Sequence, residues 1–434
     1  MRSSTRIALF LAIALGWLAA SWTIIGALLA PLLFGGAKVA TAGVLLLTVA
    51  SILTLVLLRA ARHHPGTVVR LFVFRPFWYA QATALLLGPL AAAAALIGLP
   101  FGAAGDSGRA VLSLGCGVLA LLFVAGYAGS RRFETRRFVA TLPDLPAALE
   151  GLTIAQISDL HVGPHTSRPY LERVARAVRD ASPELIAVTG DLIDDFPADV
   201  DCYGRVFGAL AAPLGVYAIP GNHEVYAGWD EVRARLERLP LTVLVNRSVS
   251  VKRNGCRLAV VGTGDPAFGP GTGGDAAPDI ERALAGVPPN AFVLALAHNP
   301  ALWPALAARK VGLTLSGHTH WGQLAFPRLG WSLASPFLEL AMGAHISGKS
   351  LLYIHPGTGY WGLPFRLGHA SQVAIIELRR GERAALLDSP AMLLAGPAAA
   401  HHRQRVRHGA LAFSVRRPVG DRQCAATLPH HERR

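Results

Sequence analysis

Residues 315–323 read Leu-Ser-Gly-His-Thr-His-Trp-Gly-Gln and follow directly on an apolar run at 311–315. The apolar run predicts a β-strand, and the glycine after it predicts a turn. A turn at Gly317 would fan out His318 and His320, which could not reach two different ions from an extended strand. The stretch therefore predicts a strand that ends in a metal-binding loop, with two ions rather than one.

Four other segments have the same build, an apolar strand whose carboxyl end carries polar residues. They read Leu-Thr-Ile-Ala-Gln-Ile-Ser-Asp-Leu-His at 152–161, Glu-Leu-Ile-Ala-Val-Thr-Gly-Asp at 184–191, Gly-Val-Tyr-Ala-Ile-Pro-Gly-Asn-His-Glu at 215–224 and Phe-Val-Leu-Ala-Leu-Ala-His at 292–298. Taken singly, such motifs are most often turns, helix caps or structural histidines. Open α/β sheets bind ligands at the carboxyl ends of their strands, so we expect the polar ends to form one site.

In this order, Asp-x-His, Gly-Asp, Gly-Asn-His-Glu, a single His and Gly-His-Thr-His resemble the motifs of the calcineurin-like metallophosphoesterases, over roughly residues 150–380. The resemblance implies an α/β fold, a four-layer α/β/β/α sandwich of two mixed sheets. It also implies two divalent ions held by seven side chains. One ion would take Asp159, His161 and His320, the other would take Asn222, His298 and His318, and Asp191 would bridge the two.

The resemblance also implies a mechanism. Mixed imidazole and carboxylate ligands favour Mn, Fe or Zn over Ca or Mg. In the family, the two ions polarise a phosphoryl group and hold a bridging hydroxide that attacks phosphorus, and His223 protonates the leaving oxygen. Asp191 and His223 are therefore the expected catalytic residues. Glu224 either orients His223 or is a surface carboxylate. Trp321, where relatives often have glycine, either shapes the substrate pocket or packs against the following strand.

The front of the chain is too apolar for a purely soluble protein. Of the 434 residues, 52% are hydrophobic and only 16% are charged, and the excess lies in four runs at 7–30, 39–58, 77–100 and 111–130. Each run is long enough to cross the hydrocarbon core of a bilayer as a helix. The first lacks a clear small-residue cleavage site, which disfavours a signal peptide. The runs contain hardly any ionisable residues, so they predict an anchor rather than a transporter.

Basic residues predict the orientation of this anchor. Arginines precede the first run, separate the second from the third and follow the fourth, whereas the opposite loops hold only Lys38 and Arg109. This multi-pass arrangement places both termini and the large domain in the cytoplasm. A reducing compartment agrees with the four single cysteines, Cys116, Cys202, Cys256 and Cys424. The formal net charge of +14 favours anionic lipid over nucleic acid, because no interleaved aromatic and basic pattern suggests base stacking.

The predicted domain organisation has four parts. A transmembrane module at 1–137 is followed by a connector at 138–150, a metallophosphoesterase domain at 151–380 and a largely disordered basic tail at 381–434. Within the domain, strands and helices alternate to about residue 240, and strands dominate thereafter. The apolar segment 326–342 either packs in the core or lies against the bilayer and receives an acyl chain.

These observations predict a membrane-anchored binuclear-metal phosphohydrolase that cleaves a phosphodiester or pyrophosphate bond. Relatives that carry Gly-Thr-Gly-Tyr-Trp-Gly, found here at 357–362, include membrane-associated phosphoesterases, which favours a lipid-linked substrate. Two alternatives are the same chemistry on a soluble nucleotide or phosphoprotein, and a non-catalytic metal-binding sensor or scaffold at the membrane. The sequence does not indicate an oligomeric state.

Overall fold

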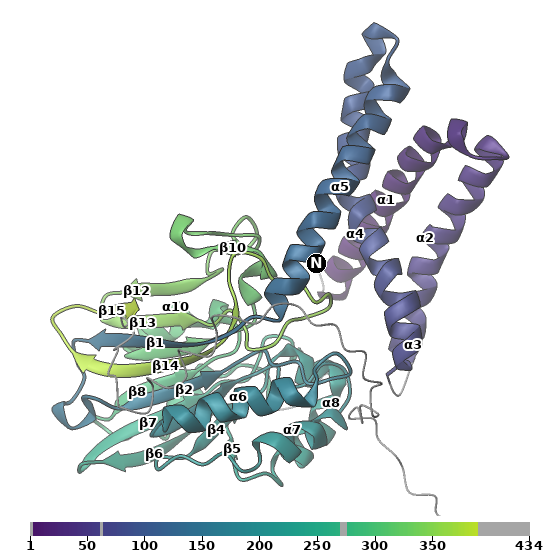
Figure 1. Cartoon of the computed structure of the whole chain (residues 1–434). Helices are drawn as coiled ribbons and strands as arrows, with labels where there is room; N and C mark the ends of the chain where they lie inside the picture. The colour runs from purple at the N-terminus through teal and green to yellow at the C-terminus, as the bar shows by residue number, and fades with distance from the viewer. Residues whose placement is uncertain (1–2, 61–63, 270–275, 389–434) are drawn as a thin grey trace, which may run out of the picture. The chain divides into compact units, whose positions relative to one another are not determined.

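The computed structural model describes residues 3–60, 64–269 and 276–388, and the chain divides into two compact units, Met1–Ala128 and Gly129–Arg434 (Figure 1). Most of the predicted tail, residues 389–434, lies outside the described residues. Its first part does not: strand β15 (Ala385–Asp388) belongs to the second unit, so the predicted tail boundary at 381 was too early.

The first unit is helical. Its helices are α1 (Ser3–Leu29), α2 (Gly36–Ala60), α3 (Thr67–Val69), α4 (Arg75–Gly98) and α5 (Ala104–Ser130), with a π-helical turn at Arg70–Phe74 between α3 and α4. Four helical stretches within the described residues are long and apolar enough to cross a membrane: Ala12–Leu32, Gly36–Thr54, Thr67–Phe101 and Ala104–Ser130. The third begins ten residues before the predicted run because α3 and the π-helical turn continue into α4.

Small residues let these helices approach one another closely. A Cβ placed on Gly88 of α4 would meet Ser21 Cβ of α1 at 2.5 Å. Buried Leu87, Ala91 and Leu112 form the centre of the contact between α4 and α5. Within a membrane no hydrophobic driving force brings helices together, so apolar helices associate through close packing of this kind.

The second unit contains two mixed sheets. The seven-stranded sheet has the order β15-β1-β14-β2-β3-β4-β5, and the six-stranded sheet has the order β12-β13-β9-β8-β7-β6. The strands of the first are β1 (Phe133–Leu142), β2 (Thr153–Ile157), β3 (Leu185–Thr189), β4 (Val216–Ile219), β5 (Thr242–Val243) and β14 (Ser371–Arg380), with β15. Those of the second are β6 (Arg247–Arg253), β7 (Cys256–Gly262), β8 (Phe292–Leu296), β9 (Leu313–Ser316), β12 (Gly343–Ser347) and β13 (Ser350–Ile354).

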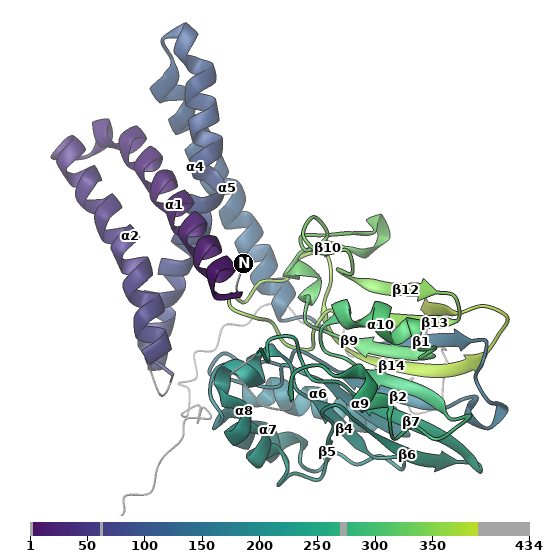
Figure 2. The same cartoon turned by 180° about the vertical axis from the view of Figure 1, so that it is seen from behind.

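The sheets face each other across one apolar layer, and helices cover their outer faces (Figures 1 and 2). Ile154 and Leu185 of one sheet and Leu294 and Leu313 of the other belong to the same buried cluster. Three helices pack on the outer face of the seven-stranded sheet: α6 (Arg168–Ala181), α7 (Asp199–Phe207) and α8 (Asn222–Leu236). Two shorter helices cover the other sheet: α9 (Ile280–Leu284) and α10 (Trp303–Ala308). The predicted α/β fold with two mixed sheets is therefore confirmed.

Strand β1 differs from the predicted connector at 138–150. It begins at Phe133, pairs in parallel with β14 and antiparallel with β15, and buries Phe138, Ala140 and Leu142. Residues 138–142 read Phe-Val-Ala-Thr-Leu, which shows no alternation of apolar and polar residues, and the arginines before them hide the start of the strand. Only two residues thus separate the end of α5 from the start of the sheet.

The layer between the sheets predicts a large effect of truncation. Leu294 is fully buried between them, whereas Leu387 on β15 is 57% exposed. We expect Leu294→Ala to cost about 2–5 kcal/mol, because it leaves a cavity in a packed layer. The control Leu387→Ala should cost less than about 0.5 kcal/mol. Unfolding of the full chain in detergent, followed by near-UV circular dichroism, measures both, and equal losses would contradict this packing.

Candidate metal centre

The predicted polar residues follow the carboxyl ends of strands in both sheets. Asp159 and His161 follow β2, Asp191 follows β3, and His298 follows β8. Asn222 and His223 begin α8 directly after β4, and His318 and His320 follow β9. Because β2, β3 and β4 run parallel, as do β8 and β9, their ends lie on one side of each sheet. The structure brings all of these residues together.

A first group consists of Asp159, His161 and His320. The Nε2 atoms of the two histidines lie 3.0 Å apart, and His320 Nε2 lies 3.4 Å from Asp159 Oδ1. All three residues are buried. One nitrogen from each imidazole and one carboxylate oxygen therefore converge on a single point, which is the arrangement of ligands around one ion.

A second group consists of Asp191, Asn222, His298 and His318. His318 Nδ1 lies 2.8 Å and His298 Nε2 3.3 Å from Asn222 Oδ1, and His298 Nε2 lies 3.2 Å from Asp191 Oδ2. The same oxygen, Asp191 Oδ2, lies 3.8 Å from Nε2 of His161, a member of the first group. Asp191 therefore stands between the two groups, as the predicted bridging role requires.

Left-handed backbone aims these side chains into the site. Five of the residues have positive φ: Asp159 (51°), His161 (46°), Asp191 (50°), His318 (72°) and His320 (49°). For a residue with a Cβ this conformation costs roughly 1–2 kcal/mol. Strain of this kind persists only where the surroundings hold it, and it is common at functional sites. Here the hydrogen bonds from Asp159 N–H to Gly190 O and from His161 N–H to Asp191 O join the two loops.

The turn after β9 differs in place from the prediction. We expected it at Gly317, but the left-handed residues are His318 and the run from His320 to Gln323. Gly317 is needed for a different reason, since a Cβ there would lie 2.2 Å from Asp159 Oδ2. The missing side chain lets the loop pass against a buried carboxylate, and His318 N–H donates to Asp159 Oδ1 at 2.8 Å.

Burial and neighbouring charges set the protonation of the cluster. Burial disfavours a charge on His298, but the adjacent Asp191 and then Asp159 raise its pKa well above the ordinary value. Burial opposes ionisation of Asp191, yet His298 holds the pKa of this carboxyl well below its usual range. Burial and His298 lower the pKa of His318 to about 4, and burial and His161 lower that of His320. At neutral pH, His318 and His320 are therefore uncharged and keep the lone pair that a metal ligand needs.

The residues present fit a pair of divalent cations. Asp159 Oδ2 is buried without a hydrogen-bond partner among the described residues. Two imidazole Nε2 atoms lie 3.0 Å apart, next to a carboxylate. These electron-pair donors surround one point. Nitrogen and oxygen donors in this mixture suit transition metals, as predicted.

Glu224 has neither of the two roles that the sequence left open. Its carboxylate is fully buried, so it is not a surface group. It accepts four backbone N–H groups: those of Gly221 (2.7 Å), Asp191 (3.0 Å), Leu192 (2.8 Å) and Ile193 (3.2 Å). No contact between this carboxylate and the His223 ring is found among the described residues. Glu224 therefore ties the loop after β4 to the loop after β3.

His223 is held by a residue that the sequence did not single out. Its Nδ1 lies 2.6 Å from the backbone oxygen of Asp194 and 3.8 Å from Asp194 Oδ1. Asp194 Oδ1 is also 3.5 Å from His161 Nδ1. The signal was an acidic residue three positions after Asp191, which is too common a pattern to stand out. Asp194 positions both imidazoles from outside the two groups.

A second residue missed in the sequence is Arg366. Its guanidinium is fully buried and donates to the carbonyl oxygens of Pro356 (2.7 Å) and Gly357 (3.3 Å). Burial lowers the pKa of Arg366 to about 10. This arginine fixes the loop after β13 beside His320, since a Cβ on Gly357 would lie 2.9 Å from His320 Nδ1.

For Trp321 the structure supports the packing alternative. The indole is buried with Trp303, Leu352 and Ile354, and its N–H donates to Ile354 O at 3.0 Å.

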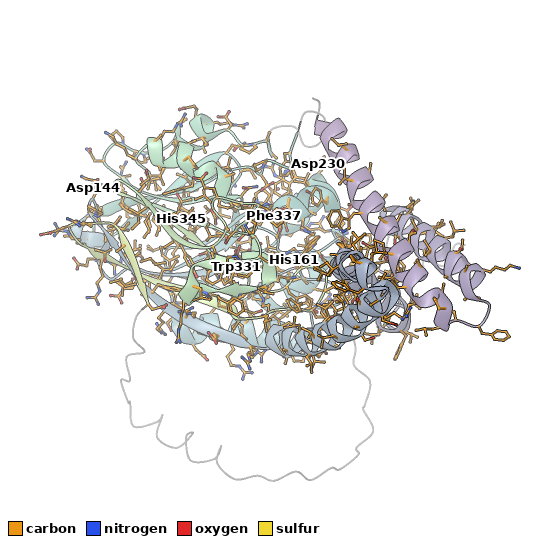
Figure 3. All side chains as sticks on the ribbon, turned by 90° about the horizontal axis from the view of Figure 1, so that it is seen from above. Asp144, His161, Asp230, Trp331, Phe337 and His345 are labelled. Carbon is orange, nitrogen blue, oxygen red and sulfur yellow. The ribbon has the colours of Figure 1, made fainter. Side chains whose placement is uncertain are left out.

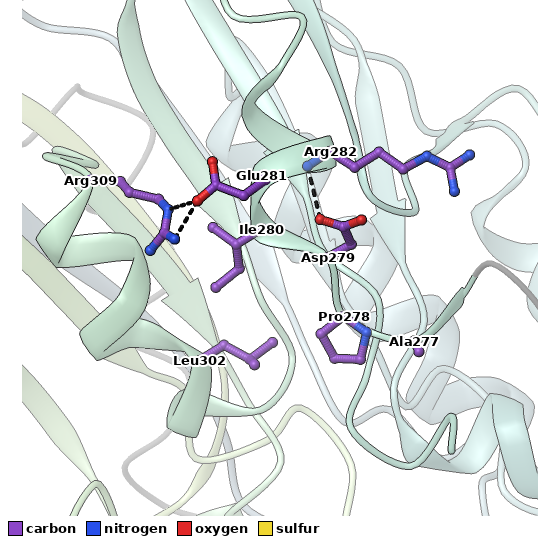
Figure 4. A pocket seen from close by; sticks show the side chains of 8 residues that line it. All are labelled: Ala277, Pro278, Asp279, Ile280, Glu281, Arg282, Leu302 and Arg309. Atoms are coloured by element: carbon purple, nitrogen blue, oxygen red, sulfur yellow. Dashed lines mark hydrogen bonds and ion pairs between the residues drawn. The ribbon is translucent and has the colours of Figure 1, made fainter. Parts of the chain in front are cut away.

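A separate surface groove, shown in Figure 4, shares no residue with the histidine cluster. Its lining residues are Ala277, Pro278, Asp279, Ile280, Glu281, Arg282, Leu302 and Arg309.

Comparison with known proteins agrees with this geometry. Residues 152–322 match the family model described as calcineurin-like phosphoesterase. A transmembrane protein with metallophosphoesterase domain from Danio rerio is 32% identical over 250 residues, covering 54% of this chain and 55% of that protein. An uncharacterized metallophosphoesterase from Helicobacter pylori strain J99 is 31% identical over 228 residues, covering 52% and 60%. One from Aquifex aeolicus is 28% identical over 247 residues, covering 57% and 92%.

The chain thus spans little more than half the length of the first two of these relatives. The fold and the buried donor groups agree with the match to calcineurin-like phosphoesterases. The match is confined to residues 152–322, and members of the calcineurin-like phosphoesterase family that it describes use divalent metals.

The four hydrogen bonds to Glu224 predict that its charge and both its oxygens are needed. Glu224→Gln should destabilise the second unit by about 1–3 kcal/mol, because an amide group then faces backbone N–H donors that lose their acceptor. Thermal unfolding of the full chain measures the loss. Glu231→Gln on the same helix is the matched control, since Glu231 is exposed and pairs with Arg235 at the surface, a pair worth at most about 1 kcal/mol. Similar losses in both variants would refute the role of Glu224.

Proposed function

We propose that this chain is a membrane-anchored phosphohydrolase that uses two divalent ions to cleave a phosphodiester or pyrophosphate bond. The observation that carries the proposal is the pair of buried donor groups joined by the Asp191 carboxylate. Every predicted ligand position holds a residue able to bind a metal. A non-catalytic sensor would not need the His223 ring beside the first group, so the catalytic alternative is favoured.

In this proposal, Asp159, His161 and His320 hold one ion, and Asn222, His298 and His318 hold the other, with Asp191 shared. Mn, Fe and Zn suit these ligands best. When bound, the ions supply Lewis-acid polarisation of the phosphoryl group and a water nucleophile of lowered pKa. Asp191 also accepts the His223 backbone N–H at 2.9 Å, which couples the shared ligand to the acid–base residue.

His223 is the proposed general acid. Its Nδ1 faces the backbone carbonyl of Asp194, so this nitrogen carries a proton, and in the doubly protonated ring Nε2 is the nitrogen that would give its proton to the leaving oxygen. The ring lies 4.5 Å from that of His161, centroid to centroid, at the border of the first group. Two exposed aromatic rings, Tyr226 and Trp361, lie within 6.2 Å of it and are placed to contact the leaving group.

We further propose a lipid-linked substrate and a multi-pass topology with the domain in the cytoplasm. The four apolar helices support the anchor, and the basic residues between them support the orientation. A soluble nucleotide or phosphoprotein substrate is the competing proposal. Hydrolysis by the full chain of a diester on a lipid, compared with the same diester in water, separates the two. A reporter fused after Arg434 that is active only outside the membrane would contradict the orientation.

The shared position of Asp191 predicts loss of metal. Purified Asp191→Asn should retain less metal than the wild type, because an amide cannot neutralise two cations. With added Mn it should hydrolyse neither bis-p-nitrophenyl phosphate nor p-nitrophenyl phosphate above background. Metal analysis and the two assays check this, with Asp230→Asn, an exposed aspartate on α8, as the control. A fully active Asp191→Asn, or an inactive wild type that holds two metals, would move the proposal to a binding module.

The acid role of His223 predicts a leaving-group effect. We expect His223→Ala to keep its metal and to lose about 10²- to 10⁴-fold in kcat on a diester with an alkoxide leaving group, since general acid catalysis is worth that much. With p-nitrophenolate, which leaves without a proton, the loss should be clearly smaller. The control His345→Ala removes a histidine that is hydrogen-bonded to the Met342 carbonyl and is not among the predicted ligands. Equal losses on both substrates would rule out proton donation by His223.

A further inference from the structure

One loop of the second unit exposes an unusual amount of apolar surface. We call residues 326–338 the apolar loop; it includes β11 (Trp331–Ser332), which pairs with β10 (Ala325–Phe326). Single exposed apolar residues are ordinary, but six on one loop of this length form a patch. Their exposed fractions are Phe326 40%, Leu329 78%, Trp331 40%, Leu333 48%, Phe337 81% and Leu338 42%. The following residues Leu340 and Met342 instead pack beside Trp303 and Trp321.

The apolar loop is held in place at its base. Ala325 N–H donates to Leu367 O, and Leu367 N–H donates to Gln323 O, both at 3.0 Å. Leu333 N–H donates to Leu324 O at 2.8 Å, which closes the loop on itself. The Phe326 and Trp331 rings stack with centroids 6.2 Å apart. The apolar side chains therefore stay exposed on a fixed framework.

The segment 366–371, which is hydrogen-bonded to the base of the apolar loop, also contacts the chain where α5 ends. Ser371 N–H donates to Arg132 O at 3.2 Å, and a Cβ on Gly129 would meet the Arg366 carbonyl oxygen at 1.9 Å. Segment 366–371 thus contacts both the end of α5 and, through Leu367, the base of the apolar loop. Both contacts lie inside the second unit.

The connection from α5 to the sheet is too short to hold the domain away from a bilayer. Helix α5 ends at Ser130 and β1 begins at Phe133, so only Arg131 and Arg132 lie between them. Two extended residues span about 7 Å at most, by the usual rise of about 3.6 Å per residue. The headgroup region on each side of a bilayer is about as thick, roughly 5–7 Å. Where α5 crosses a membrane, the anchored loop therefore lies within reach of its surface.

We propose that the apolar loop docks on the lipid bilayer, with its leucines and phenylalanines among the acyl chains near the surface. The chemistry of the loop fits this occupant. Trp331 is the residue type that membrane interfaces enrich, and Arg328 at the tip of the hairpin suits anionic headgroups. Docking would fix how the metal centre faces the membrane. Docking rests on the proposed membrane crossing of α5 and does not depend on hydrolysis.

Spin labels on the full chain in liposomes test the docking. Cys116, Cys256 and Cys424 are replaced by alanine, whereas buried Cys202 is kept, and a label is attached at Phe337→Cys (Figure 3). Collision with oxygen, which dissolves in lipid, is compared with collision with a water-soluble nickel chelate. We expect the oxygen-to-nickel ratio at 337 to be several-fold higher than at the control site, Asp144→Cys. Asp144 is exposed beyond the far end of β1, fourteen residues after Ser130, the last residue of α5.

Three outcomes decide the proposal. A high ratio at 337 that falls when Leu329→Asp is added supports docking, because the aspartate disfavours burial in lipid. A ratio at 337 equal to that at 144 overturns it, since the loop then lies in water. Low collision with both reagents, together with broadening between labels, also overturns it, because a second copy of the chain then covers the loop. Phosphodiester hydrolysis, measured in the same samples, reports separately on the metal centre.

Discussion

Three buried carboxylates, Asp159, Asp191 and Glu224, impose the constraint on which the rest of the second unit depends. An unpaired charge in a protein interior costs several kcal/mol, so each must be neutralised or hydrogen-bonded. Glu224 is satisfied by backbone N–H groups, Asp191 by His298 and the His223 backbone, and Asp159 in part by the His318 N–H. The two sheets bring these partners together at the carboxyl ends of their strands. Asp159 Oδ2 has no hydrogen-bond partner among the described residues, which indicates that cations neutralise the remaining negative charge.

The same crowding explains why glycine precedes a ligand in several of the motifs. A Cβ on Gly221 would lie 2.2 Å from Asp191 Oδ1, just as one on Gly317 would meet Asp159. The loops can approach a carboxylate closely enough to donate N–H groups only where no side chain intervenes. The left-handed backbone at the predicted ligands contributes as well, because it turns their side chains toward the metal centre between the ends of the two sheets.

The parts of this structure that local chemistry determines could be predicted from the sequence, and the parts set by distant backbone could not. Ligands such as Asp159 and His320 stand next to strand ends, so residue type and order predict their grouping. The role of Glu224 depends on N–H groups some thirty residues earlier, and that of Asp194 on the position of two imidazoles. Trp321 was undecided because its partner carbonyl, that of Ile354, lies on another strand. Strand β1 was missed because its partners are more than two hundred residues away.

The position of β1 determines where this protein can be cut into a soluble fragment. The family match begins at residue 152, but β1 fills the place between β14 and β15 in the sheet. A recombinant fragment that starts at the family boundary would lose all ten residues of this strand. It would expose the edge of β14, leave β15 without a neighbour and uncover Leu378 and Tyr353 in the layer between the sheets. Open strand edges of this kind pair with other chains and aggregate, so a soluble fragment has to begin at Arg131 or Arg132.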